Sequence, residues 1–178
     1  MSTAVAQQRG SVVVAWLRLL RLPNHATAVA DVLAGWLVIA RPESVAAPPA
    51  AFWAAAAASL LLYAAGMVLN DVFDRELDAV ERPERPLPRG LIAPATAAFV
   101  GWLTAAGGVA AGITAAVLSG HPAVAGVAAA LAAAVYLYDR HAKPTAAGPL
   151  VMGSCRSLNW LLGMTAAGGP NEAAEWLP

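Results

Sequence analysis

Charged residues are scarce in this sequence. Asp, Glu, Lys and Arg make up 12% of its 178 residues, and the 11 acidic and 11 basic side chains cancel to a formal net charge of zero. A neutral chain has no basic field to attract nucleic acid, and we find no zinc-knuckle spacing or aromatic-basic repeat that would supply one. We therefore expect no nucleic-acid partner.

Cysteine and histidine are scarce as well. The single cysteine, Cys155, cannot form an internal disulfide bond, and its hydrophobic neighbours in the sequence favour a small core residue. The three histidines, His25, His121 and His141, have no second histidine or cysteine at metal-ligand spacing. The sequence therefore predicts neither a disulfide framework nor a zinc site.

Hydrophobic residues are abundant, at 59% of the sequence with a mean hydropathy of +0.60, which is typical of a polytopic membrane protein. A helix needs about 20 apolar residues to cross a bilayer core of about 30 Å. We predict an all-α transmembrane helix bundle. Residues 1–23 are expected to form a cytoplasmic tail and an amphipathic lead-in helix, and residues 24–178 a single transmembrane domain. The expected spans, about five, lie at residues 24–40, 51–70, 95–119, 122–138 and 145–167.

Basic residues follow the predicted spans in alternation, which orients the bundle by the positive-inside rule. One set of connections holds Arg9, Arg18, Arg21, Arg75, Arg82, Arg85, Arg89, Arg140 and Lys143, whereas the opposite set holds only Arg41. The amino terminus and the acidic loop are therefore expected to be cytoplasmic, and residues 171–178 to lie on the far side. We expect a multi-pass protein of a bacterial cytoplasmic membrane.

The stretch LNDVFDRELDAVERPERPLPRG, residues 69–90, concentrates charge in an otherwise apolar chain. Asp71, Asp74 and Asp78 are spaced i, i+3 and i+7, and Asn70 lies one turn before Asp74, so a helix continuing past the membrane surface would place all four on one face. Neighbouring carboxylates repel each other unless they share a counter-charge, and oxygen ligands suit Mg²⁺, which commonly bridges to substrate phosphates.

Arginines follow these acids at short intervals, as Arg82, Arg85 and Arg89. Their forked donors match phosphate oxygens well, so acids for a metal followed by arginines for a diphosphate form a coherent site. The alternative is a solvated interfacial loop whose arginines only obey the positive-inside rule.

The order of residues in this stretch resembles the first signature of the UbiA superfamily of intramembrane prenyltransferases, NDxxDxxxD followed by RPLxxG, without a gap. The resemblance implies the amino-terminal part of a nine-helix fold. It also implies Mg²⁺-dependent transfer of a prenyl group from a prenyl diphosphate to an aromatic or lipid-alcohol acceptor in the membrane, where lipid surrounds the protein. By the same resemblance, Asn70, Asp71, Asp74 and Asp78 hold Mg²⁺ and the diphosphate, and Arg82 and Arg85 bind the phosphates.

Two further segments extend the resemblance. The family carries a tyrosine and a lysine in the next cytoplasmic loop, which YLYDRHAKP provides as Tyr138 and Lys143, although an interfacial aromatic and a positive-inside lysine would look the same. The run GPLVMGSCRSLNWLLGM, residues 148–164, resembles UbiA-like proteins encoded in bacterial Ebo metabolite clusters.

Polar residues also occur inside the predicted spans. Arg156 and Asn159 share one face of the fifth span, and Asp31 lies within the first. A charge in the membrane needs a partner or a watery cavity, so the sequence leaves two roles open. One is a structural Asp31–Arg156 ion pair, and the other is direct contact of Arg156 and Asn159 with the acceptor or the phosphates.

The family carries a second aspartate-rich motif, usually of DxxxD type, in a later cytoplasmic loop, and this sequence has no such motif after the first one. Glu172 and Glu175 are expected on the far side of the membrane, too distant to replace it. We therefore expect a fragment of a longer protein that inserts but does not catalyse transfer alone. The rival interpretation is a catalytically inactive lipid-binding or assembly protein.

Overall fold

A computed structural model describes residues 12–40 and 42–168 of the chain, and these residues form helices and turns without strands. The all-α prediction is therefore confirmed. A helix over residues 12–20 is followed by η1 (Leu22–Asn24), α2 (His25–Ile39), α3 (Pro42–Ala46), α4 (Ala50–Phe73), α5 (Arg75–Glu81), α6 (Pro94–Ser119), α7 (Ala123–Leu137), the π-helical turn η2 (Tyr138–Ala142) and α8 (Gly148–Ala166).

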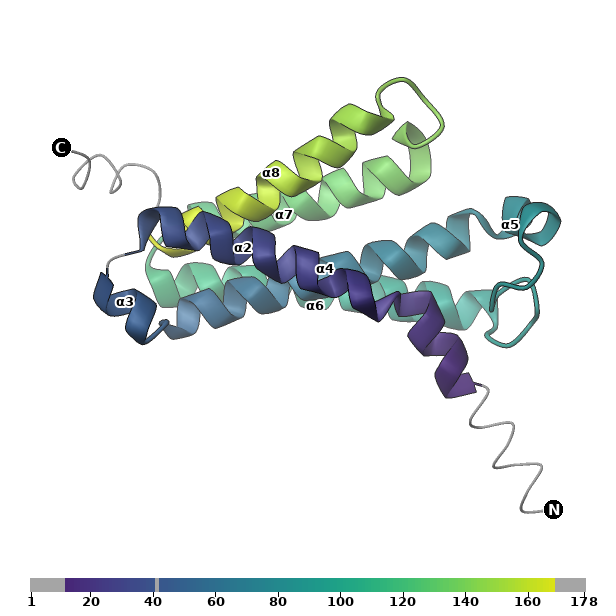
Figure 1. Cartoon of the computed structure of the whole chain (residues 1–178), viewed down its shortest axis with the longest axis horizontal. Coiled ribbons are helices and arrows are strands. Elements are labelled where there is room, and N and C mark those ends of the chain that lie inside the picture. The colour runs from purple at the N-terminus through teal and green to yellow at the C-terminus, as the bar shows by residue number, and fades with distance from the viewer. Residues whose placement is uncertain (1–11, 41, 169–178) are drawn as a thin grey trace, which may run out of the picture.

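The long helices lie side by side in one bundle, with α4 packed along α6, α2 against α8, and α7 against both α6 and α8 (Figure 1). The helix over residues 12–20, α5 and the α7–α8 connection lie at one end, and α3 lies at the other (Figure 1). The basic residues of these three segments therefore gather at one end of the bundle, as the positive-inside pattern requires. Arg9 and Arg41 lie outside the described residues.

Four helical stretches of the described chain are long and apolar enough to cross a membrane: Val12–Ile39, Ala50–Phe73, Pro94–Ser119 and Ala123–Ala142. This is the composition of an integral multi-pass membrane protein. The fifth predicted span corresponds to α8, which is 19 residues long. Helix α8 is not among the four because it carries Arg156, Asn159 and several serines and glycines, so of the five expected spans it is the most polar.

Close crossing of α2 and α8 depends on two glycines. A methyl group at Gly35 would overlap the carbonyl of Trp160, and one at Gly163 would overlap the carbonyl of Val32. Small residues allow membrane helices to approach until their backbones nearly touch. This approach brings Asp31 of α2 and Arg156 of α8 within bonding distance, although 125 residues separate them.

The first apolar stretch, Val12–Ile39, is broken at Arg21, before α2. Arg21 adopts a left-handed backbone conformation, with φ 49° and ψ 49°, which is uncommon for a residue other than glycine. The helix over residues 12–20 turns at this point and packs Ala15 and Leu19 against Leu87 and other apolar residues of the same end. The turn places the Arg21 side chain over the acidic motif.

Candidate active site

The acidic motif lies where α4 meets α5. Asn70 and Asp71 belong to the last turn of α4, Asp74 connects the two helices, and Asp78 is buried on α5. We predicted one continuous helix through all four residues. Instead, α4 ends at Phe73, and the break lets the four side chains point to different partners.

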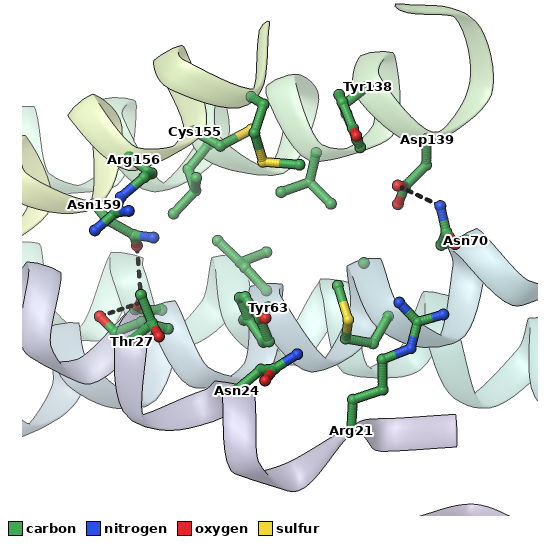
Figure 2. A pocket seen from close by; sticks show the side chains of 18 of the residues that line it. Arg21, Asn24, Thr27, Tyr63, Asn70, Tyr138, Asp139, Cys155, Arg156 and Asn159 are labelled. Atoms are coloured by element: carbon green, nitrogen blue, oxygen red, sulfur yellow. Dashed lines mark hydrogen bonds between the residues drawn. The ribbon is translucent and has the colours of Figure 1, made fainter. Parts of the chain in front are cut away.

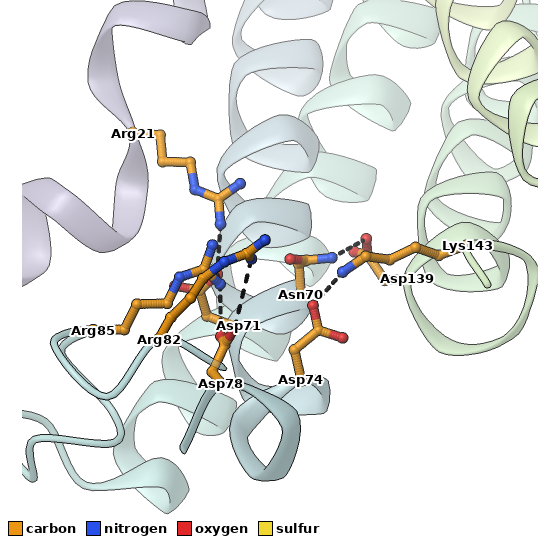
Figure 3. Close-up of polar contacts among 9 residues, drawn as sticks. All are labelled: Arg21, Asn70, Asp71, Asp74, Asp78, Arg82, Arg85, Asp139 and Lys143. Atoms are coloured by element: carbon orange, nitrogen blue, oxygen red, sulfur yellow. Dashed lines mark hydrogen bonds and ion pairs between the residues drawn. The ribbon is translucent and has the colours of Figure 1, made fainter. Parts of the chain in front are cut away.

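Arginines pair with Asp71 and Asp78 of the motif (Figure 3). Arg85 Nη1 lies 2.6 Å from Asp78 Oδ2 and 3.3 Å from Asp71 Oδ1, and Arg21 Nη2 lies 2.7 Å from Asp71 Oδ1. Arg82 Nη1 is farther from its partner, at 3.7 Å from Asp78 Oδ1. Burial alone would lower the pKa of Arg85, but its hydrogen bond to Asp78 and the charge of Asp71 outweigh burial and raise that pKa.

Residues of the α7–α8 connection and of the π-helical turn before it contact Asn70 and Asp74, the other two residues of the motif. Lys143 Nζ donates to Asp74 Oδ2, and Asn70 Nδ2 donates to Asp139 Oδ1 at 3.1 Å (Figure 3). All three motif carboxylates therefore have cationic partners, and Asp71 and Asp78 share Arg85. Within the part of the chain that the structure describes, no three acidic, histidine or cysteine side chains converge as a metal-ligand group.

The chemistry of the donors still fits Mg²⁺. They are carboxylate and amide oxygens, and Mg²⁺ typically takes one or two carboxylates and completes its shell with water and substrate phosphates. Four aspartates and four cations face one another in this group, so their formal charges cancel. We call it the charged cluster; its members are Arg21, Asn70, Asp71, Asp74, Asp78, Arg82, Arg85, Asp139 and Lys143 (Figure 3).

A cavity of about 520 Å³ opens from the charged cluster into the bundle. Asn70, Asp139 and Arg21 lie at one end, and Arg156 and Asn159 lie at the other (Figure 2). The wall between the two ends is mostly apolar and includes Leu62, Tyr63, Met67, Leu131, Val135 and Met152. Of the predicted site residues, Tyr138, Lys143, Arg82 and Arg85 also line this cavity.

The far end of the cavity holds a second group, Asp31, Ser59, Arg156, Asn159 and Trp160, which we call the inner polar cluster. Asp31 Oδ1 accepts from Arg156 Nη2 at 3.0 Å and from Trp160 Nε1 at 3.2 Å. Ser59 Oγ donates to Asn159 Oδ1 at 2.8 Å. The Asp31–Arg156 ion pair is therefore formed. Contact of Arg156 and Asn159 with an acceptor or phosphate stays a prediction.

Two residues of the charged cluster escaped the sequence prediction. In the sequence, Arg21 contributes only to the orientation of the bundle, and the pattern that points to Tyr138 and Lys143 does not include Asp139. The available signal was the position of Asp139 in a polar turn that follows a helix of Ala, Val and Leu residues. Glu172 and Glu175 lie outside the described residues.

Comparison with curated proteins finds local similarity to archaeal enzymes. The chain is 55% identical over 38 residues to digeranylgeranylglyceryl phosphate synthase of Methanothrix thermoacetophila, covering 21% of this chain and 14% of that protein. It is 37% identical over 83 residues to the synthase of the same name from Methanopyrus kandleri, covering 47% of this chain and 29% of that protein. These matches span well under two thirds of the relatives' length.

The fold and the family are found over most of the chain. A solved structure concerning digeranylgeranylglyceryl phosphate synthase in membranes superposes with a TM-score of 0.76 and 24% identity, covering 92% of this chain and 56% of that one. At this identity the likeness shows the fold, which is that of a membrane prenyltransferase. A model of the UbiA prenyltransferase family matches residues 28–178, and the chain therefore belongs to the UbiA prenyltransferase family.

Proposed function

We propose that this protein transfers a prenyl group from a prenyl diphosphate to the hydroxyl of a lipid alcohol, with Mg²⁺. The observation that carries this proposal is the cavity that joins the charged cluster to an apolar wall. A prenyl diphosphate has the same division, since its diphosphate is charged and its hydrocarbon tail is apolar. Family membership supports the reaction class.

The charged cluster is suited to the diphosphate. Arg82 and Arg85 present forked donors that phosphate oxygens accept in pairs, and Lys143 adds a third cation. Asn70, Asp71, Asp74 and Asp78 are the residues that would hold Mg²⁺, which when bound supplies positive charge against the diphosphate. Because the cluster is neutral by itself, a bound cation is needed for net attraction of a polyanion.

Transfer breaks the bond between the terminal prenyl carbon and the diphosphate oxygen, and the bonding electrons leave with the diphosphate. The acceptor oxygen forms the new bond to that carbon, and its hydroxyl proton passes to solvent or to the released diphosphate. Arg82, Arg85 and Lys143 would stabilise the charge that develops on the departing oxygens. The apolar wall of the cavity would keep water from the electron-poor prenyl carbon.

The named relatives bear on the acceptor, and the distribution of basic residues bears on the orientation. The sequence left an aromatic or a lipid-alcohol acceptor open, and the relatives named above are synthases of a glyceryl phosphate lipid, which favours the lipid alcohol. The basic residues at the end that holds the charged cluster favour a cytoplasmic position for it. A bacterial source stays a prediction.

The test is a transfer assay with the native protein in membranes. Labelled geranylgeranyl diphosphate is supplied with a panel of glycerophosphate lipid alcohols and aromatic acceptors, with Mg²⁺ or with a chelator. We expect labelled lipid only with Mg²⁺ and chiefly from the glycerophosphate alcohols. Tight binding of the diphosphate without any product would instead support the inactive lipid-binding alternative.

A further inference from the structure

Asp139 is a buried carboxylate with one oxygen unused. The residue is 8% exposed, Oδ1 accepts the hydrogen bond from Asn70, and Oδ2 is buried without any hydrogen-bond partner in the described part of the chain. Figure 2 shows Asp139 pointing from the α7 side of the cavity toward Asn70 on α4. A buried carboxylate oxygen is costly unless something satisfies it, so this oxygen marks a place for a group from outside the chain.

Asp139 lines the cavity, from which such a group could approach it. Gly66, one turn before Asn70, lies beside it: a methyl group there would be 2.8 Å from Val135 Cγ1 and 3.7 Å from Asp139 Oδ2. The charged side chains that act on Asp139 from nearby are Lys143, Asp74 and Arg21. The amine of Lys143 is already bonded to Asp74 and the guanidinium of Arg21 to Asp71, so neither cation occupies Oδ2.

We propose that Asp139 Oδ2 is a direct ligand of a divalent cation of the Mg²⁺ type, bound with the diphosphate between the α7–α8 connection and the acidic motif. This inference rests on the proposed function. Asn70 and Asp74 are the motif residues on the same side of the charged cluster. Asn70 donates to Asp139 through Nδ2, which leaves its Oδ1 as an oxygen ligand, and Asp74 adds carboxylate oxygens. The π-helical turn η2 that carries Asp139 is a feature frequently found at functional sites.

Charge balance supports a cation here rather than a second phosphate contact. The charged cluster is neutral, and its arginines gather around Asp71 and Asp78. On the opposite side, Asp74 and Asp139 carry two negative charges against the one positive charge of Lys143. A diphosphate approaching that side meets excess negative charge, which a divalent cation bound to Asp139 would reverse.

The test measures metal binding apart from turnover. The full chain, purified in detergent, is titrated with Mn²⁺ by electron paramagnetic resonance, alone and with a non-reactive prenyl thiolodiphosphate. Asp139→Asn removes the charge but keeps an oxygen to accept from Asn70. We expect it to weaken Mn²⁺ binding in the presence of the analogue by at least about tenfold, the lower end of the loss for outer-shell partners of a metal.

The matched control is Glu76→Gln, which removes the same charge from an exposed side chain at the same end of the bundle. It should leave Mn²⁺ binding unchanged. Wild-type Mn²⁺ affinity in Asp139→Asn would overturn the inference. The proposed function is tested separately by the transfer assay. If Mn²⁺ binding depends on Asp139 but no prenyl transfer is found, the cation site stands and only the proposed reaction is wrong.

A second variant distinguishes a ligand from a structural residue, and it decides the question if Asp139→Asn does not fold. Asp139→Cys is made in a Cys155→Ala background, because Cys155 also lines the cavity. Direct ligation predicts a thiolate-to-metal charge-transfer band with one equivalent of Cd²⁺. Glu76→Cys in the same background serves as the exposed-thiol control, and equal bands in both variants would overturn the inference.

Discussion

The two ends of the cavity hold their charges in different ways. In the charged cluster, two carboxylates share a partner, because Asp71 contacts Arg21 and Arg85 and Asp78 contacts Arg82 and Arg85. Asp74 pairs with Lys143. In the inner polar cluster, Asp31 pairs with one arginine, Arg156. Arg85 can turn to a phosphate while Asp71 and Asp78 each keep another arginine, whereas Arg156 cannot turn away without leaving Asp31 only a neutral donor, the indole of Trp160. We therefore interpret the charged cluster as a binding site and the inner pair as a structural link between α2 and α8.

The largest effect should follow from loss of a carboxylate in the charged cluster. Asp71→Ala or Asp74→Ala in the native protein is expected to reduce Mg²⁺-dependent prenyl transfer by about a hundredfold or more, as for loss of one preorganised charge-stabilising group. Initial rates of labelled-lipid formation provide the measurement. Glu76→Gln is the control, and near-normal turnover of both alanine variants would contradict the assignment of this end as the diphosphate site.

The arginines sharpen the comparison within the charged cluster. Arg85→Ala should weaken prenyl diphosphate binding by about ten- to a hundredfold, the value of one charge-assisted contact. Arg82→Ala should have a smaller effect, because its side chain is 51% exposed and lies farther from Asp78. Equilibrium binding of a fluorescent analogue measures both. Arg75→Ala removes the same charge from a side chain of α5 that is 53% exposed, and an equal loss in all three variants would indicate generic surface charge.

The same contrast shows what the sequence could predict. The acidic motif is local, so spacing alone located Asn70, Asp71, Asp74 and Asp78 together, and hydropathy located the long helices. The partners of these residues come from elsewhere in the chain: Asp139 lies 69 residues from Asn70, and Arg21 lies 50 residues from Asp71. Such pairs depend on how helices cross, which a hydropathy pattern does not specify.

Loss of the ion pair in the inner polar cluster should have a smaller effect than the changes in the charged cluster. We expect it to lower stability and to leave diphosphate binding unchanged. Arg156→Met leaves Asp31 buried with only the indole of Trp160 as a donor. Loss of a fully buried partner costs about 3 to 5 kcal/mol, and because the Arg156 side chain is 63% exposed we expect about 2 kcal/mol. The free energy of unfolding in detergent is the measurement. The double variant Asp31→Asn, Arg156→Met should be more stable than Arg156→Met alone, and further loss would contradict a structural pair.

The smallest effect should come from the hydroxyl of Ser59. Ser59→Ala removes the donor to the buried Asn159 amide oxygen, so the free energy of unfolding should fall by about 1 kcal/mol. Ser154→Ala is the matched control, because that hydroxyl bonds only to a carbonyl of its own helix at an exposed position. Prenyl diphosphate affinity should be the same in both variants, since Ser59 belongs to the inner polar cluster and not to the charged cluster. If Ser59→Ala weakens diphosphate binding while Ser154→Ala does not, the two ends of the cavity are coupled, and the inner polar cluster must then contribute to binding as well as to stability.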